Sequence, residues 1–288
     1  MRVLVTGAGG QLADASAAGY AGIADVLALS HAELDITDDD AVRRRVLAFR
    51  PDAIVNCAAY NHVDRAEEEP VQALNVNAFA LRTLARSASS VGAALVHYSS
   101  DFVFDGGASV PYTEDDPPNP QSVYAVSKLL GEWFARDAPR AFVLRVESLF
   151  GGPTAKASVD RIVAAIADGR EARVFTDRTV SPSYVVDVAA ATRALLERGQ
   201  PGLYHCVAGG FCTWHELGQE IARQLGRPAH LVPISVNDVP LPAARPRFAA
   251  LSEAKLRRAG IEMPSWQDAL SRHLRIRTQS PPSTSPTR

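Results

Sequence analysis

The feature of this sequence that most constrains its fold is the alternation of short apolar runs with longer helical segments in its first half. Apolar runs of this length are typical of parallel strands that are buried on both faces. Repeated β-α units predict an α/β fold with a doubly wound parallel sheet, whose ligands bind at the carboxyl ends of the strands. The expected strands are Arg2–Thr6, Val26–Leu29, Ala53–Asn56, Ala94–Tyr98 and Ala141–Val146, with helices such as Asp38–Phe49 and Val71–Val91 between them.

The second half of the chain has a different rhythm. Amphipathic helices are expected at Ser158–Gly169 and Thr213–Leu225, and residues 233–248 form a Pro-rich linking stretch. The sequence therefore predicts one domain over residues 1–150 and a smaller C-terminal substrate-binding lobe over 151–183 and 209–277. Residues 184–208 are expected to return to the first domain as a helix and a strand. The Pro/Ser-rich tail, 278–288, is expected to be disordered.

Composition and charge exclude several classes of protein. The 288 residues carry a net charge of −2, so there is no basic stripe for nucleic acid. Apolar runs stay below 18 residues, which argues against a membrane span, and the start MRVLVTGAGG is typical of a strand and turn rather than of a signal peptide. The three cysteines have no metal-type spacing, so we expect reduced thiols, no metal and a cytoplasmic location.

A glycine-rich turn follows the first strand directly. Residues Gly7 to Ala13 (GAGGQLA) lie between the strand RVLVT and an Ala-rich helix. This context predicts a Rossmann-type dinucleotide site, since glycines allow a tight turn and the helix N-terminus attracts a pyrophosphate. The residues expected to bind the cofactor here are Gly7, Gly9, Gly10, Gln11 and Leu12.

The ends of the next strands extend this predicted cofactor groove. Ser30 stands after the second strand, at the position where a carboxylate would bind an adenine ribose. Because no carboxylate stands there to repel a 2′-phosphate, the sequence favours NADPH over NADH. Asp35 and Ile36 are expected at the adenine edge. Cys57, Ala58 and Ala59, from the run NCAAY, are expected to line the groove.

The stretch SVYAVSKLLGE places Tyr124 and Lys128 four residues apart. On a helix these side chains share one face, so an ammonium could stabilise a phenolate and lower its pKa. Taken alone, the spacing also fits a lysine that merely covers an aromatic ring. The rest of the chain has to decide between a catalytic pair and a surface contact.

Several motifs together resemble the extended short-chain dehydrogenases/reductases, and within them the dTDP-4-dehydrorhamnose reductase family. They are TGxxGQL, LDITD at Leu34–Asp38, VDRAE at Val63–Glu67, SSDFVFDG at Ser99–Gly106, PPNPQSVYAVSK and PSY at Pro182–Tyr184. The resemblance implies an NAD(P)H-dependent oxidoreductase that reduces the 4-keto group of a nucleotide-linked deoxysugar. It also implies a catalytic set of Ser100, Tyr124 and Lys128, in which Tyr124 donates the proton and Lys128 and Tyr124 also contact the cofactor.

Other residues take roles from the same resemblance. Asn77 matches an asparagine that supports the active-site helix, and we expect it beside the cofactor. Asp101 and Phe102 follow the catalytic serine, and Arg245 could meet a diphosphate. Ser148 stands where the family usually has a tryptophan near the sugar, which puts the exact sugar in doubt. The expected substrate-binding residues are thus Asp101, Phe102, Ser148 and Arg245.

Competing functions remain on the same fold. A dehydratase of this group needs an acid/base pair, typically Asp-Glu, directly after the catalytic serine, but here Ser100-Asp101 is followed by Phe102, so the base for dehydration is missing. A nucleotide-sugar epimerase with retained cofactor is harder to exclude, and so is a non-catalytic, reductase-like regulatory subunit. An intact Ser100, Tyr124 and Lys128 set favours catalysis. The resemblance allows a homodimer, whereas the sequence itself does not indicate the oligomeric state.

Overall fold

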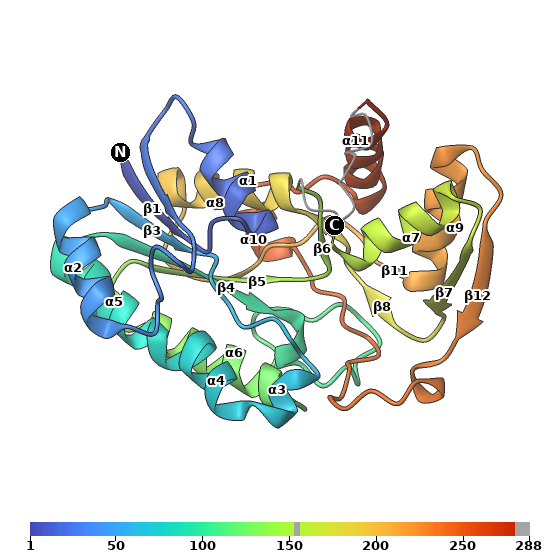
Figure 1. Cartoon of the computed structure of the whole chain (residues 1–288), viewed down its shortest axis with the longest axis horizontal. Helices are drawn as coiled ribbons and strands as arrows, with labels where there is room; N and C mark the ends of the chain where they lie inside the picture. The colour runs from blue at the N-terminus through green and yellow to red at the C-terminus, as the bar shows by residue number, and fades with distance from the viewer. Residues whose placement is uncertain (153–155, 280–288) are drawn as a thin grey trace, which may run out of the picture.

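The centre of the molecule is a parallel sheet. The structure is a computed structural model that describes residues 1–152 and 156–279. Its six-stranded sheet has the order β10-β5-β4-β3-β1-β2, and each neighbouring pair is parallel (Figure 1). This confirms the α/β fold, and β10 lies at the edge of the sheet beside β5. The strands are β1 Arg2–Thr6, β2 Asp25–Leu29, β3 Ala53–Asn56, β4 Ala94–Ser100, β5 Ala141–Val146 and β10 Gly202–His205.

Helices cover both faces of this sheet. Alternate residues of β1 point to opposite faces: Val3 and Val5 pack on the side of α1 and α8, whereas Leu4 packs on the side of α2, α5 and α6. Both faces of the sheet are therefore buried, which explains why the strand sequences are continuous apolar runs. The helices are α1 Gln11–Gly19, α2 Asp39–Phe49, α5 Ala80–Val91, α6 Val123–Ala135 and α8 Val185–Arg198.

The strand order reverses next to β1. The chain moves from β1 outward to β2 and then crosses to β3 on the other side of β1. A crevice forms outside the carboxyl ends of strands at such a switch point. The ends of β1, β3 and β4 lead there directly into Gly7, Cys57 and Asp101.

The segment expected as one helix, Val71–Val91, is interrupted. It consists of α4 (Pro70–Leu74), a π-helical turn η1 (Asn75–Phe79) and α5, and a short helix α3 (Arg65–Glu68) precedes it. Turns of this wider kind occur mostly as single insertions at functional sites. The expected helical stretch is therefore helical throughout, but its turn at Asn75–Phe79 is a π-helix, in which Asn77 bonds to Tyr60 and Ser127.

Smaller elements form the rest of the molecule. Helices α7 and α9 pack against the parallel pair β7/β12, on the right of Figure 1, and one hydrophobic cluster continues from the sheet into them. These elements are β6 Leu149–Phe150, α7 Ser158–Ala167, β7 Glu171–Phe175, β8 Thr179–Val180, β9 Ser183–Tyr184, β11 Cys212–Thr213, α9 Trp214–Leu225, β12 His230–Ile234, α10 Ala254–Arg258 and α11 Trp266–Gln279, with the single 3-10 turns Asp101–Val103 and Val236–Asp238.

The C-terminal tail was expected to be disordered from residue 278. Helix α11 includes residues 278 and 279, which corrects the start of that prediction, and residues 280–288 lie outside the described part of the chain. Within the described ranges, no helix is long and apolar enough to cross a membrane.

Candidate active site

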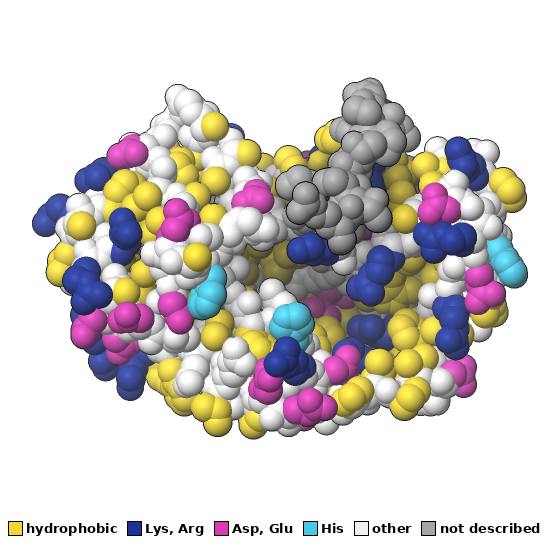
Figure 2. All heavy atoms as spheres, viewed as in Figure 1, with side chains coloured by type: hydrophobic (Ala, Val, Ile, Leu, Met, Phe, Trp, Pro, Cys, Tyr) yellow, Lys and Arg dark blue, Asp and Glu magenta, His cyan; other side chains and the backbone are white. Residues whose placement is uncertain are grey.

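Two adjoining cavities lie at the carboxyl ends of the sheet strands. The first, of about 420 Å³, extends from the glycine turn to the C-terminal elements, and the second, of about 510 Å³, extends from the same turn toward the end of β2. The surface is hollowed between the two halves of the molecule, and Lys and Arg side chains gather in the hollow (Figure 2). The cavities share the lining residues Gly10, Cys57, Ala58, Ala59 and Asn61. Together they form one elongated groove.

The glycine turn brings backbone very close to backbone. Gly7 has a φ of 78°, and a Cβ atom there would lie 2.8 Å from the Ala58 amide nitrogen. The Gly10 amide donates to the Gly7 carbonyl at 3.1 Å, which closes the turn just before α1. A side chain at position 7 would therefore have to push β3 away from β1.

The first turn of α1 supplies donors to the groove. Its leading N–H groups have no partner inside the helix, and Gln11 and Leu12 line the first cavity. The Gln11 side-chain nitrogen is buried without a hydrogen-bond partner among the described residues. Gly9 differs from the other turn residues, because its amide donates to Asp14 at 2.8 Å and it lines neither cavity.

The second cavity is the end of the groove near β2. Asp35 and Ile36 line it together with Gly7 and His31. Ser30 does not, because its amide and hydroxyl both donate to the Glu33 carboxylate, at 2.9 and 2.7 Å. The inference that no carboxylate stands after the second strand was incomplete: Glu33 folds back onto that strand end. These bonds hold the pKa of Glu33 below its usual value.

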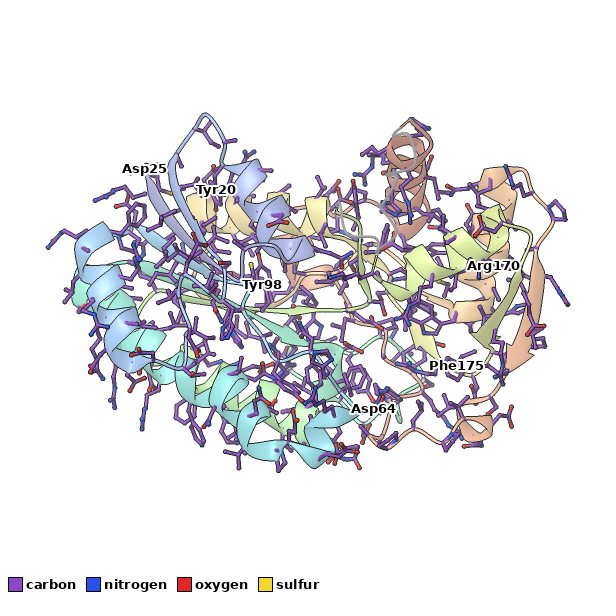
Figure 3. All side chains as sticks on the ribbon, in the orientation of Figure 1. Tyr20, Asp25, Asp64, Tyr98, Arg170 and Phe175 are labelled. Carbon is purple, nitrogen blue, oxygen red and sulfur yellow. The ribbon has the colours of Figure 1, made fainter. Side chains whose placement is uncertain are left out.

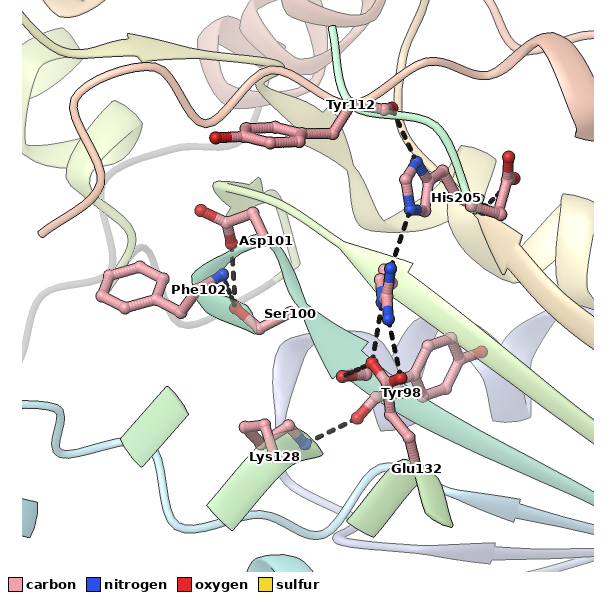
Figure 4. Close-up of polar contacts among 11 residues, drawn as sticks. Tyr98, Ser100, Asp101, Phe102, Tyr112, Lys128, Glu132 and His205 are labelled. Atoms are coloured by element: carbon pink, nitrogen blue, oxygen red, sulfur yellow. Dashed lines mark hydrogen bonds and ion pairs between the residues drawn. The ribbon is translucent and has the colours of Figure 1, made fainter. Parts of the chain in front are cut away.

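The predicted catalytic residues converge on the first cavity. Ser100 ends β4, and Tyr124 and Lys128 lie on α6, whose N-terminus is capped by the Ser122 hydroxyl accepting from the Ala125 amide at 3.2 Å. All three catalytic candidates are buried. The Lys128 ammonium donates to the Tyr98 carbonyl at 2.6 Å (Figure 4). The helical spacing thus delivers both side chains to the end of β4.

The electrostatics differ from the simplest expectation for such a pair. Burial and the nearby Asp101 carboxylate raise the pKa of Tyr124 above its ordinary value, while the Ser100 hydroxyl opposes this. Burial lowers the pKa of Lys128 to about 8, against the attraction of Glu132. The expected lowering of the tyrosine pKa is therefore not seen, because desolvation of the phenol dominates.

Asn77 positions the active-site helix from behind. Its side-chain oxygen accepts from the Tyr60 amide at 2.9 Å, and its nitrogen donates to the Tyr60 carbonyl and the Ser127 hydroxyl, both at 3.0 Å. Asn77 is buried and lines neither cavity. Asn77 therefore links η1, the segment after β3 and α6, and its expected place beside the cofactor stays a prediction.

A buried ion pair ties α6 to the sheet. Glu132 accepts from the Arg145 guanidinium at 2.8 and 2.9 Å and from the Ser99 hydroxyl at 2.6 Å (Figure 4). On the far side of Arg145 lies His205, whose pKa is lowered to about 3 by burial and by that guanidinium. This network fixes the helix one turn beyond Lys128.

The predicted substrate residues are only partly brought together. Asp101, Phe102 and Ser148 line the first cavity, and the Ser100 hydroxyl donates to Asp101 at 2.8 Å. Burial raises the pKa of Asp101 to about 6. Arg245 does not itself line the cavity: its guanidinium pairs at 2.7 Å with Asp64, in the lower half of Figure 3, and lies 5.7 Å from the ring of Phe102, which does line it. Its role as a substrate ligand stays a prediction.

Sequence reasoning missed three cavity residues that come from distant segments. Arg178 lies before β8, Glu147 follows β5, and Trp214 opens α9. Trp214 offers an aromatic wall in a cavity where Ser148 is small. The available signal for Trp214 was the capping box of Thr213 and Glu216, which marks the start of α9. No local pattern marks Arg178 or Glu147.

Among the described residues, no three or more His, Cys, Asp or Glu side chains lie close enough together to hold a metal ion. Cys57, Cys206 and Cys212 are free thiols.

Comparison with known proteins decides the family. The RmlD substrate binding domain family matches residues 1–278. The chain belongs to this family. A dTDP-4-dehydrorhamnose reductase of Mycobacterium tuberculosis is 38% identical over 94% of this chain and 91% of that protein.

Solved structures of similar proteins agree with this assignment to the RmlD family. A crystal structure of a dTDP-4-dehydrorhamnose reductase from Clostridium acetobutylicum is 32% identical, with a TM-score of 0.93, and covers 97% of this chain and 100% of its own. Another, from Bacillus anthracis in complex with NADP, is 32% identical, with a TM-score of 0.90, and covers 96% of this chain and 99% of its own.

Proposed function

We propose that this protein is an NADPH-dependent oxidoreductase that reduces the 4-keto group of a nucleotide-linked deoxysugar, as the names of its dTDP-4-dehydrorhamnose reductase relatives suggest. The observation that carries the proposal is the meeting of Ser100, Tyr124 and Lys128 in one buried cavity that continues into the glycine turn. A cofactor and a carbonyl substrate can then meet at the end of β4.

The residues present fit a dinucleotide. The Gly7 turn leaves no room for a side chain, the first-turn amides of α1 face the groove, and the buried Gln11 nitrogen has no partner among the described residues. These groups would hold a pyrophosphate, and Asp35 and Ile36 would meet the adenosine. Lys128 and Tyr124 would lie at the nicotinamide end. When bound, the nicotinamide supplies the hydride that the carbonyl carbon accepts.

The chain's own residues manage the proton and the carbonyl oxygen. A raised pKa keeps Tyr124 protonated at neutral pH, so its phenol is ready to donate to that oxygen. A positioned acid contributes about 10²- to 10⁴-fold in rate. The Ser100 hydroxyl, which donates to Asp101 in the structure, would turn to donate to the same oxygen and stabilise its developing charge. The Lys128 ammonium, held by the Tyr98 carbonyl, adds a positive charge on the same side.

We also propose a location and partners for the protein. The three free thiols suit a reducing compartment, which supports a cytoplasmic location. Homodimer formation stays a prediction. A nucleotide sugar is the expected partner, and neither nucleic acid nor a membrane is expected.

The test follows NADPH absorbance with a dTDP-4-keto-6-deoxysugar, comparing wild type with Tyr124→Phe. We expect one NADPH consumed per sugar and a fall in kcat of at least about 100-fold in the variant, since a general acid is lost. NADPH binding, measured by fluorescence, should be retained by both proteins.

Other outcomes would point to the competing functions. Sugar turnover without net NADPH consumption would indicate an epimerase that retains its cofactor. Cofactor binding without turnover of any 4-keto sugar would indicate a non-catalytic subunit. Either result would overturn the reductase proposal.

A further inference from the structure

Glu147 places a buried carboxyl group in the wall of the catalytic cavity. It follows β5 directly, is 2% exposed, and lines the cavity together with Tyr124 and Asp101. One carboxyl oxygen, Oε2, accepts the Ser181 amide at 2.8 Å. The other, Oε1, is buried without a hydrogen-bond partner among the described residues.

An unpartnered buried oxygen of this kind calls for an explanation. Leaving a buried acceptor unpaired costs about 1–3 kcal/mol, and buried polar groups in folded proteins usually have a partner. Ser181 is fully buried and its amide occupies Oε2, while its hydroxyl, which also lacks a partner among the described residues, lowers the pKa of the same carboxyl group. Oε1 is then the oxygen left for a molecule in the cavity.

The charges around Glu147 indicate what kind of group that molecule offers. Burial and the nearby Asp101 carboxylate hold the pKa of Glu147 well above its usual range, against Ser181 and Arg178. The neutral carboxyl is favoured, so Oε1 can both donate and accept a hydrogen bond. Arg178 lines the same cavity and suits an anionic part of a ligand, whereas the neutral carboxyl of Glu147, a donor and an acceptor at once, matches a hydroxyl.

We propose that Glu147 Oε1 hydrogen-bonds a ring hydroxyl of the sugar, which makes Glu147 a specificity-determining residue. This inference rests on the proposed reductase function. A residue that binds the sugar would then lie next to Ser148, directly after β5. A role as the base that removes a proton next to the keto group is less suited to this carboxyl, because burial disfavours its charged form.

The experiment measures kcat/KM for a dTDP-4-keto-6-deoxysugar and for its 2-deoxy and 3-deoxy analogues. Wild type should reduce one analogue at least about 10- to 100-fold less efficiently than the parent, because a site group that hydrogen-bonds a hydroxyl is left unpaired by the analogue. Wild type that reduces the parent and both analogues equally well would overturn the inference while leaving the reductase function intact.

Two variants then assign the discrimination to Glu147. Glu147→Leu should lower kcat/KM for the parent by about 10- to 100-fold, with little change for the rejected analogue, so that the discrimination disappears. Glu147→Gln keeps an acceptor for the Ser181 amide and a donor for the cavity, and should retain most of the discrimination. A uniform loss over all three sugars would show a merely structural role.

A matched control and a second readout complete the design. The control is Glu114→Gln, which alters a partly buried carboxylate outside the cavity; Glu114 accepts a hydrogen bond from the His205 amide at 2.7 Å. This variant should leave the discrimination unchanged. Solvent deuterium appearing in recovered sugar with wild type but not with Glu147→Gln would assign proton abstraction to Glu147 and overturn the hydroxyl role. No turnover by wild type with any sugar would instead overturn the reductase proposal itself.

Discussion

The proposed cofactor side and the proposed substrate side of the groove are built differently. The cofactor side consists largely of backbone at consecutive strand ends, with Gly7, Cys57 and Ala58 in contact range of each other. The substrate side consists of side chains from distant segments, among them Asp101, Glu147 and Arg178. Backbone geometry tolerates few alternatives, whereas single side chains can be exchanged. We infer that the cofactor side is fixed by the fold and that the substrate side sets which sugar is reduced.

The largest expected contrast concerns two arginines on the substrate side. Arg178→Lys keeps a charge near Asp101 and Glu147 but loses the guanidinium that lines the cavity. We expect the Arg178 guanidinium to bond the sugar nucleotide. Because loss of a hydrogen bond to a charged group costs about 1.5–3 kcal/mol, KM for the sugar nucleotide should rise about 10- to 100-fold. Steady-state kinetics at saturating NADPH measure it.

The matched control is Arg245→Lys. This arginine pairs with Asp64 outside the cavity, and KM should change less than about threefold, as for a partly exposed ion pair. A larger effect at Arg245 than at Arg178 would restore the sequence-based assignment of Arg245 to the substrate.

On the cofactor side, Gly7→Ala tests close packing together with backbone strain, and Gly9→Ala tests backbone strain alone. Both positions have positive φ, but a Cβ meets the Ala58 backbone only at Gly7, and at Gly9 nothing lies within 4 Å. Strain alone costs about 1–3 kcal/mol at either site. We expect NADPH binding to weaken at least about tenfold more in Gly7→Ala, because moving β3 widens the groove and tenfold corresponds to about 1.4 kcal/mol. Fluorescence titration tests this, and equal Kd values would contradict it.

The buried Lys128 makes stability depend on pH. Its pKa is about 8 in the folded protein against 10.5 as the ordinary value, so the unfolded chain binds the extra proton between these pH values. The free energy of unfolding should therefore gain a contribution from Lys128 as pH rises from 8 to 10, of up to about 3 kcal/mol. Urea denaturation at several pH values, compared with Lys128→Met, measures it. An identical pH dependence in both proteins would contradict it.

The smallest expected effect concerns the choice of cofactor. The Glu33 carboxylate lies on Ser30 at the end of β2, where a 2′-phosphate would approach. Glu33→Gln should raise the preference for NADPH over NADH by about two- to fivefold, the size typical of an exposed charge. Asp25→Asn, at the amino end of the same strand (Figure 3), is the control and should change nothing. An unchanged ratio in Glu33→Gln would mean that this carboxylate does not act on the cofactor.

Much of the cofactor side could be predicted because its signals are local. The five strands of the first half and the turn at Gly7 depend on residues that are neighbours in sequence, and the structure has them where expected. The approach of Tyr124 and Lys128 also follows from helical spacing alone. Their catalytic roles remain predictions that kinetics must test.

The substrate side could be predicted only in part. Asp101 and Phe102 followed from their place after Ser100, but Arg178, Glu147 and Trp214 reach the cavity from segments separated by dozens of residues. The pairing of Arg245 with Asp64, 181 positions away in sequence, could not be predicted either, and the role of Arg245 toward the substrate stays a prediction. Asn77 was expected beside the cofactor, yet its bonds to Tyr60 and Ser127 draw it behind the helix.

The sequence by itself determined the sheet, the glycine turn and the helix that carries Tyr124 and Lys128. Periodicity, turn chemistry and capping act between near neighbours, so they can be read without knowing the fold. Only the tertiary structure decided which charges are buried, which are paired, and which reach the cavity. Burial and pairing depend on how distant segments pack, and desolvation then sets the pKa values of Tyr124, Lys128 and Glu147.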